Sequence, residues 1–99
     1  MEKFKELNLS NELLDAINRA GFHTPSEVQV KTIPLVLKGL DVIGSSATGS
    51  GKTLAFSAGI IDKTFAGNGI QALILTPTRE LAEQVGQTIS KFSNKKILE

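Results

Sequence analysis

The 99-residue sequence has no cysteine, no tryptophan and no tyrosine, and its net charge is only +1. Without cysteine the chain can form neither a disulfide nor a thiolate metal site. No run of 18 apolar residues occurs, and the N-terminal residues lack the apolar core of a secretory signal. We therefore expect a cytoplasmic protein without a membrane span. The charge balance predicts no strong positive field, although a few placed groups could still bind nucleic acid.

The composition that is present is that of an ordinary globular domain, with 40% hydrophobic and 21% charged residues. Apolar residues recur at helical spacing over residues 11–20. Ser10 stands where a helix N-cap is needed, and Gly21 follows where a left-handed residue ends a helix. These signals predict a first helix over residues 11–20.

A second helix start lies at residues 24–29, where two capping boxes overlap. Apolar positions continue from there to Gly39, which ends the pattern. Pro34 lies inside this helix and should kink it or remove one of its hydrogen bonds. The two capping pairs are Thr24 with Glu27 and Ser26 with Gln29.

The rest of the chain alternates strand and helix patterns. Residues 41–45 predict a short strand, and residues 70–76 form a near-continuous apolar run that is typical of a strand covered on both faces. Helical patterns follow each of them, over residues 52–66 and 80–92. This alternation predicts an α/β fold with a parallel sheet, flanking helices and right-handed crossovers.

A phosphate-binding loop is the strongest functional signal, because it lies between a predicted strand and a predicted helix. Its glycines allow a tight turn whose N–H groups point inward, next to the positive end of the helix dipole. Lys52 should bridge the β- and γ-phosphates of a nucleotide, and the Thr53 hydroxyl should bind Mg²⁺. The alternative is a glycine- and serine-rich turn without a ligand. The loop consists of Ser46, Ala47, Thr48, Gly49, Ser50, Gly51, Lys52 and Thr53.

This loop resembles that of the DEAD-box RNA helicases, A-x-T-G-S-G-K-T, with Ser46 in place of the small first residue. Residues 21–29 are similar to the family's Q motif, G-x-x-x-P-T-x-I-Q, with two mild replacements. The family also has an isolated aromatic residue 17 positions before that glycine, and Phe4 stands 17 positions before Gly21. The resemblance implies that Phe4 stacks on adenine and that Gln29 binds its edge.

The chemistry of Gln29 agrees with that role, because a primary amide can pair with N6 and N7 of adenine. Guanine presents O6 instead of an amino group, so Gln29 would favour ATP over GTP. A structural alternative stands beside each role. Gln29 could simply close the capping box with Ser26, and Phe4 could be an ordinary core aromatic.

Residues 77–82 resemble motif Ia of the same family, which contacts the RNA sugar-phosphate backbone. Pro77, Thr78 and Arg79 are therefore the expected RNA-binding residues. A hydroxyl, an arginine and a helix N-terminus can contact phosphate oxygens without reading the base sequence. The alternative for Arg79 is a solvated first-turn residue.

The resemblance implies the N-terminal half of a RecA-like P-loop NTPase domain, with ATP and Mg²⁺ as cofactors and RNA as partner. Residues 1–40 would form a helical Q-motif region, and residues 41–99 a P-loop β-α-β-α unit. The resemblance further implies an ATP-dependent RNA helicase, an RNA-dependent ATPase that unwinds or remodels RNA. Gln29 with Phe4 argues against a different P-loop enzyme, such as a small-molecule kinase.

Several parts of the helicase machinery do not occur in these 99 residues, including an Asp-Glu-Ala-Asp segment. Phosphoryl transfer depends on such parts for metal binding and for placing the attacking water. We therefore expect an incomplete first domain that does not hydrolyse ATP alone. In the family, strands from later in the chain separate the two strands expected here, so both would have unpaired edges. The missing part of the helicase, or self-association, would cover them. The alternative is a truncated, non-catalytic fragment that binds nucleotide or RNA.

Overall fold

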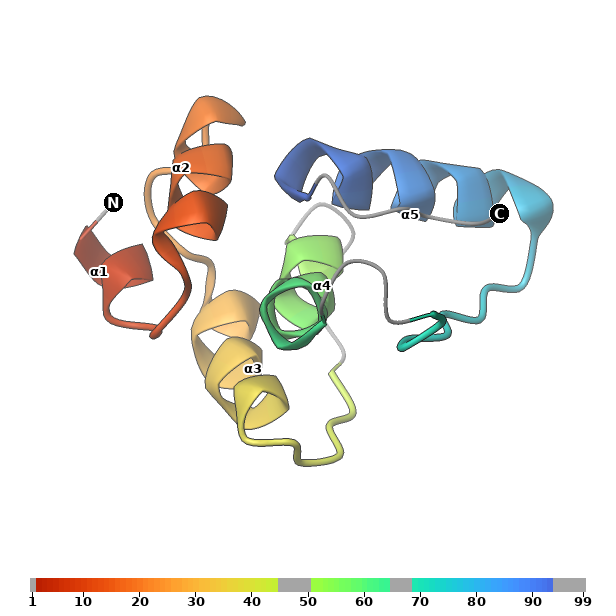
Figure 1. Cartoon of the computed structure of the whole chain (residues 1–99), viewed down its shortest axis with the longest axis horizontal. Coiled ribbons are helices and arrows are strands. Elements are labelled where there is room, and N and C mark those ends of the chain that lie inside the picture. The colour runs from red at the N-terminus through yellow and green to blue at the C-terminus, as the bar shows by residue number, and fades with distance from the viewer. Residues whose placement is uncertain (1, 45–50, 65–68, 94–99) are drawn as a thin grey trace.

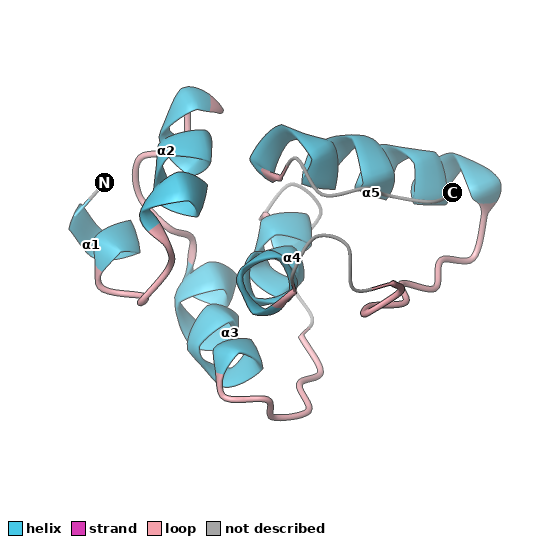
Figure 2. Cartoon of the chain, viewed as in Figure 1, coloured by secondary structure: helices cyan, strands magenta, loops and turns pink. Residues whose placement is uncertain are grey.

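The computed structural model describes residues 2–44, 51–64 and 69–93. Within these ranges the chain forms five α-helices and no β-strand (Figure 1; Figure 2). None of these helices is long and apolar enough to cross a bilayer. The helices are α1 (Glu2–Lys5), α2 (Asn11–Arg19), α3 (Glu27–Leu37), α4 (Lys52–Lys63) and α5 (Arg79–Phe92).

Side-chain caps define where three of the helices begin. The hydroxyls of Ser10, Ser26 and Thr78 each accept a hydrogen bond from the backbone N–H three residues later, at the starts of α2, α3 and α5. At α3 the Gln29 side chain accepts in return from the Ser26 N–H, which completes a capping box. Of the two overlapping boxes in the sequence, the one between Ser26 and Gln29 therefore forms.

The predicted helices are confirmed, with small changes at their ends. Helix α2 ends one residue before the predicted end, and α5 begins one residue before the predicted start. Helix α4 ends at Lys63, three residues before residue 66, and residues 65 and 66 lie outside the described ranges. Pro34 lies inside α3 as expected. The four-residue helix α1 was not predicted.

Helix α4 lies between α3 and α5 (Figure 1) and contacts α2 as well. The core forms where α1, α2 and α3 meet α4 and the C-terminal end of α5. Gly59 allows the close approach of α3 and α4, because an added Cβ would lie 2.5 Å from Val36 Cγ1. The buried core consists of Phe4, Leu7, Leu9, Leu13, Leu14, Ala16, Ile17, Ile33, Leu54, Ala58, Ile61, Ile89 and Phe92.

The two predicted strands are not formed in the described residues. Residues 41–44 and 70–76 have no regular secondary structure, and residue 45 lies outside the described ranges. A strand needs a neighbour that accepts and donates its backbone hydrogen bonds, and neither segment pairs with the other here. Their apolar side chains are exposed: Ile43 is 101% and Leu73 80% accessible to solvent. The expected parallel sheet therefore has no counterpart in the described part of the chain.

Candidate functional site

An open cleft of about 1520 Å³ runs along α4. One wall is formed by α3, another by the face of α5, and the loop segments 40–44 and 73–77 complete the lining. The cleft brings together Gln29 from α3 with Gly51, Lys52 and Thr53 at the start of α4. Two motifs that are separated by more than 20 residues in sequence thus meet in one cavity.

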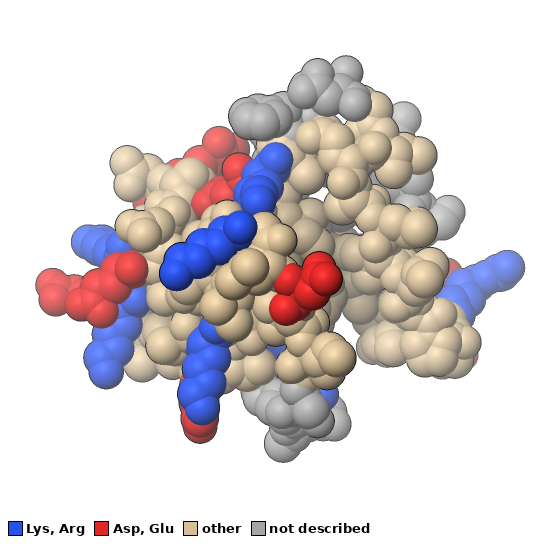
Figure 3. Space-filling view, turned by 90° about the horizontal axis from the view of Figure 1, so that it is seen from below, with Lys and Arg blue, Asp and Glu red and all other residues tan. Residues whose placement is uncertain are grey.

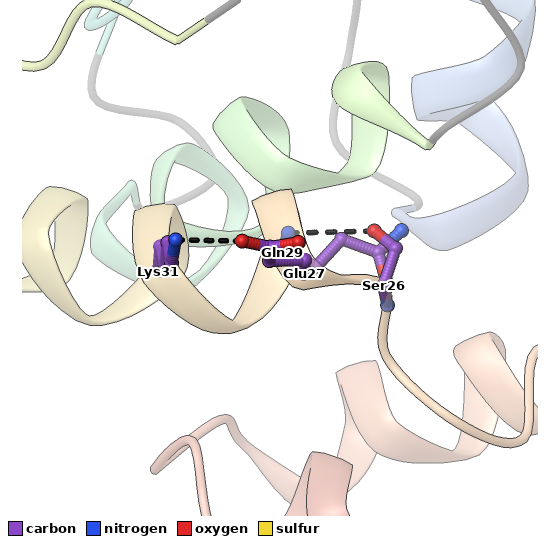
Figure 4. Close-up of polar contacts among 4 residues, drawn as sticks. All are labelled: Ser26, Glu27, Gln29 and Lys31. Carbon is purple, nitrogen blue, oxygen red and sulfur yellow. Dashed lines mark hydrogen bonds and ion pairs between the residues drawn. The ribbon is translucent and has the colours of Figure 1, made fainter. Parts of the chain in front are cut away.

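The Gln29 side chain joins these two motifs directly. The residue is only 2% exposed. Its Oε1 accepts a hydrogen bond from the Ser26 N–H at 2.9 Å (Figure 4), and its Nε2 donates to the Gly51 carbonyl at 3.2 Å. A primary amide has two N–H donors and two acceptor lone pairs, so each atom retains capacity for one further partner. The capping role of Gln29 is confirmed, and it is chemically compatible with the predicted adenine contact.

Two constraints favour glycine at position 51: its backbone conformation and the nearby side chain of Gln29. Its φ of +84° lies in the left-handed region, where side chains are strained. A Cβ at this position would also overlap the Nε2 atom of Gln29. The sequence identified Gly51 through the phosphate-loop motif, but this second reason depends on a contact between residues 22 positions apart.

The start of α4 differs from the starts of α2, α3 and α5, because Gly51 supplies no side-chain cap. The first turn of an α-helix presents N–H groups that no carbonyl within the helix accepts, and the helix dipole makes this end positive. An anion is the natural partner for such an end. Lys52 is exposed here and Thr53 is half-buried. The predicted loop residues Ser46, Ala47, Thr48, Gly49 and Ser50 lie outside the described residues.

The donor set at this site suits magnesium only together with a nucleotide. The described residues contain no group of three His, Cys, Asp or Glu side chains that could hold a metal ion. Thr53 could supply one hydroxyl ligand. Mg²⁺ keeps several waters and commonly binds through one or two protein groups plus substrate phosphates, so this sparse set fits a phosphate-bound ion.

Phe4 lies away from the cleft. It is 0% exposed and packs in the core, and the cleft lining does not include it. This placement matches the alternative of an ordinary core aromatic. Stacking on adenine would require a free ring face, so that role stays a prediction that needs α1 to move away from the core.

The three predicted RNA-binding residues lie together where the second loop segment meets α5. Pro77 lines the edge of the cleft, Thr78 caps α5, and Arg79 is exposed in the first turn of that helix. The Thr76 hydroxyl donates to the Thr78 carbonyl at 2.9 Å and orders this junction. Contact with RNA stays a prediction for these residues.

Charged side chains of both signs are interspersed on the face shown in Figure 3. One exposed pair is Lys31 and Glu27, whose Nζ and Oε1 atoms lie 2.7 Å apart in the first turns of α3 (Figure 4). The hydrogen bond from Lys31, together with its positive charge, lowers the pKa of Glu27 from the ordinary 4.5. Neither sign of charge dominates this face.

Comparison with known proteins gives consistent matches. The sequence profile of the DEAD/DEAH box helicase family matches residues 26–99. The chain is 48% identical over 93 residues to the DEAD-box ATP-dependent RNA helicase CshA of Geobacillus kaustophilus. That match covers 93% of this chain and 20% of the relative, so the chain spans about a fifth of the relative's length.

Two solved structures are similar to the chain. A DEAD box protein from the hyperthermophile Methanococcus jannaschii matches 95% of the chain with a TM-score of 0.88 and 46% identity, over 26% of its own length. The RNA helicase Prp28 from Chaetomium thermophilum, bound to ADP, matches 88% of the chain with a TM-score of 0.78 and 42% identity, over 22% of its own length. By its profile match, its identity to these relatives and its fold, the chain belongs to the DEAD/DEAH box helicase family.

Proposed function

We propose that this chain is the ATP- and Mg²⁺-binding portion of an ATP-dependent RNA helicase. The observation that carries the proposal is the hydrogen bond from Gln29 Nε2 to the Gly51 carbonyl, at 3.2 Å. This hydrogen bond brings an amide that can recognise adenine next to the start of α4, which has no side-chain cap and whose positive helix end suits phosphates. The family of the chain and the ADP bound to its relative Prp28 support the same ligand class.

Each residue of the site has a distinct role in this proposal. Gln29 pairs with the adenine edge, and Lys52 neutralises the β- and γ-phosphates. Thr53 would supply its hydroxyl as a ligand to Mg²⁺, and the ion would offset the negative charge of the phosphates. Residues 46–50 lie outside the described residues, and the motif implies that their backbone N–H groups would bind the phosphates.

RNA is the proposed macromolecular partner, in single strands or short duplexes. Pro77, Thr78 and Arg79 would contact its backbone, since a hydroxyl and a guanidinium beside a helix N-terminus suit phosphate oxygens. The name of the relative CshA, an RNA helicase, supports this partner. A cytoplasmic location, where ATP and RNA are both present, belongs to the same proposal.

We further infer that residues 41–45 and 70–76 become strands of a RecA-like parallel sheet once they gain neighbours. Their exposed apolar side chains support this inference, because such a surface is stabilised by burial. The relatives are about four to five times longer than this chain, so further parts of a helicase could supply the neighbours. A second copy of the chain is the alternative source.

One observation favours a second candidate, a nucleotide- or RNA-binding fragment without catalysis. The 99 residues contain no Asp-Glu-Ala-Asp segment, the part that in the family helps to hold the metal ion and to place the attacking water. We therefore expect the isolated chain to bind Mg·ATP without cleaving it at a helicase-like rate. RNA-stimulated phosphate release by the purified chain would contradict that expectation.

The test is a titration of the chain with fluorescent ATP and GTP analogues in the presence of Mg²⁺. We expect ATP to bind more tightly than GTP. Gln29→Glu keeps the oxygen that accepts from Ser26 but loses the N–H donor, so it should reduce the ATP-over-GTP preference about tenfold. Lys52→Ala should weaken both nucleotides together. Gln87→Ala, which removes an exposed amide from α5, is the matched control. An unchanged preference in Gln29→Glu would rule out the adenine contact.

A further inference from the structure

Gly59 lies inside α4, where glycine is an unfavourable residue. Glycine destabilises a helix interior relative to alanine, because its backbone has more conformational freedom to lose on folding. The backbone of Gly59 is helical and has no positive φ, so its conformation does not require glycine. The residue is also buried. The reason for glycine at this position therefore lies in the segment that packs against it.

That segment is the C-terminal part of α3. A Cβ added to Gly59 would lie 2.5 Å from Val36 Cγ1 and 3.0 Å from Val36 Cβ. Carbon atoms in ordinary contact lie about 3.5–4.0 Å apart, so α3 would have to retreat by about 0.5–1 Å. Rotation of the Val36 side chain relieves only part of this clash, because its Cβ atom is fixed to the backbone. The missing side chain at Gly59 thus sets how closely α3 approaches α4.

The same two helices meet again at the nucleotide site. Gln29, in the first turn of α3, donates through Nε2 to the carbonyl of Gly51, directly before α4, at 3.2 Å. At about 3.6 Å this contact would no longer be a hydrogen bond, so an increase of about 0.4 Å breaks it. Helix α3 is continuous from Glu27 to Leu37, although Pro34 lies between the two contacts. A retreat of α3 at Val36 is therefore transmitted to Gln29 through one helix.

We propose that Gly59 is a positioning residue of the nucleotide site, an inference that rests on the proposed function. By letting α3 lie close against α4, it keeps the amide of Gln29 beside Gly51, where adenine is recognised. Gly59 does not line the cleft, so its effect on adenine recognition passes through α3. Lys63 Nζ also donates to the end of α3 at 3.4 Å, but this long side chain can follow a small shift. The backbone contact at Gly59 cannot.

The experiment titrates the 99-residue chain and its Gly59→Ala variant with fluorescent ATP and GTP analogues and Mg²⁺. All titrations are made at a temperature where circular dichroism at 222 nm shows each variant fully folded. Gly59→Ala displaces Gln29 but leaves Lys52 and Thr53 at the start of α4. We expect the ATP-over-GTP ratio to fall about fivefold, the effect of roughly one hydrogen bond. Mg·tripolyphosphate, which has no base, should compete equally well for both chains.

Val36 provides a rescue on the facing helix. The double variant Gly59→Ala, Val36→Ala removes the Cγ atoms that the new methyl group would meet, so it should recover most of the lost ratio. Val36→Ala alone is the reference for this double variant. If Gly59→Ala fails to fold, Val36→Ile decides, because it adds one carbon atom to the same contact from the α3 side. It should lower the ratio by a smaller factor.

Asp62 provides a control for loss of stability without displacement of α3. Its carboxylate accepts from the backbone N–H and the hydroxyl of Ser10, at 2.8 Å each, and so joins α4 to the start of α2. Asp62→Asn should therefore lower the melting temperature and leave the ATP-over-GTP ratio unchanged. A fall of the ratio in Gly59→Ala but not in Asp62→Asn would separate a shift of α3 from general destabilisation.

The outcomes separate this proposal from the proposed function. If the parent chain prefers ATP and the folded Gly59→Ala variant keeps the same ATP-over-GTP ratio, the positioning role is overturned and the nucleotide site stands. A ratio that falls equally in Asp62→Asn, or that the double variant does not recover, would overturn it as well. If the parent chain binds neither nucleotide, the proposed function fails, and the positioning role fails with it.

Discussion

The helical part of the chain and its two loop segments contain similar apolar residues but bury them differently. Leu13 in α2 is 1% exposed, whereas Leu73 in the segment before α5 is 80% exposed. Ile17 and Ile33 are completely buried, whereas Ile43 is completely exposed. Apolar composition alone therefore does not determine burial in this chain. What differs is whether the backbone can satisfy its hydrogen bonds locally.

A helix makes its backbone hydrogen bonds within a single segment, and a polar residue at its start completes them. A strand has no such option, because its N–H and C=O groups must pair with another strand. The helices with Ser10, Ser26 and Thr78 at their starts form, and the two segments predicted as strands do not. The predictions below test this contrast, beginning with the largest expected effect.

Shortening one leucine in each region should give the largest difference. Leu13→Ala removes a buried side chain and should lower the free energy of unfolding by about 2–5 kcal/mol. Leu73→Ala changes an exposed position and should alter it by less than about 0.5 kcal/mol. Urea denaturation followed at 222 nm measures both. Equal effects would mean that the 70–76 segment is packed in solution, contrary to the structure.

Adding one methyl group at the α3–α4 contact should have the next largest effect. The Cβ of Gly59→Ala would press on Val36 Cγ1, so overpacking should cost about 1–3 kcal/mol. The double variant Gly59→Ala, Val36→Ala restores space and should recover part of the loss. Thermal melts of the two variants and of Val36→Ala measure the coupling. Strictly additive effects would show that the helices do not meet at this point.

Removing the cap of α5 should have a smaller effect. The Thr78 hydroxyl accepts from the Leu81 N–H at 3.1 Å, directly after the segment that lacks a strand. Thr78→Ala should therefore lower the free energy of unfolding by about 1 kcal/mol. Ser90→Ala, within the same helix, should change it much less. If Thr78→Ala left the free energy of unfolding unchanged, formation of α5 would depend on a sheet and not on its own cap.

The smallest expected effect is the pH dependence of the exposed Glu27–Lys31 pair. Because the folded pKa of Glu27 is lowered from 4.5, the stabilisation is present at neutral pH and is lost as the pH falls through the folded pKa. Glu27→Gln should remove only the pH dependence of stability that comes from the carboxylate of Glu27. Melting temperatures of both chains at pH 7 and pH 3 measure it. The melting temperatures of the two chains should differ more at pH 7 than at pH 3. A larger difference at pH 3 would contradict the lowered pKa of Glu27.

The sequence predicted the helices well and the two loop segments poorly. Local signals at Ser10, Ser26 and Gly21 predicted α2 and the start of α3 correctly, because caps and turns depend on residues only a few positions apart. The near-continuous apolar run of residues 70–76 indicates a covered strand, yet an apolar pattern cannot supply the neighbour that covers it. Helix α1 is too short for a periodic signal, and burial of Phe4 accounts for its position.

Among the predicted site residues, Gln29, Gly51, Lys52 and Thr53 meet in the cleft, whereas Phe4 lies in the core, and none of the contacts that join these residues was predicted. The motifs identified Gln29, Gly51 and Lys52 as members of one site. Neither motif indicates that Gln29 donates to the Gly51 carbonyl, nor that Asp62 holds Ser10, since both contacts join residues far apart in sequence. Capping and adenine binding were alternatives for Gln29 in the sequence. The capping role is confirmed, and the adenine contact stays a prediction.

Hydrogen exchange of the chain with and without Mg·ATP tests the central claim most directly. Without nucleotide, we predict that amides in the interiors of α2, α3 and α4 are protected and that those of residues 70–76 exchange at the rate of an open chain. With Mg·ATP, exchange should slow at the start of α4, at Gly51, Lys52 and Thr53. Protection of residues 70–76 equal to that of the helices, or no change at α4 on adding Mg·ATP, would contradict the account.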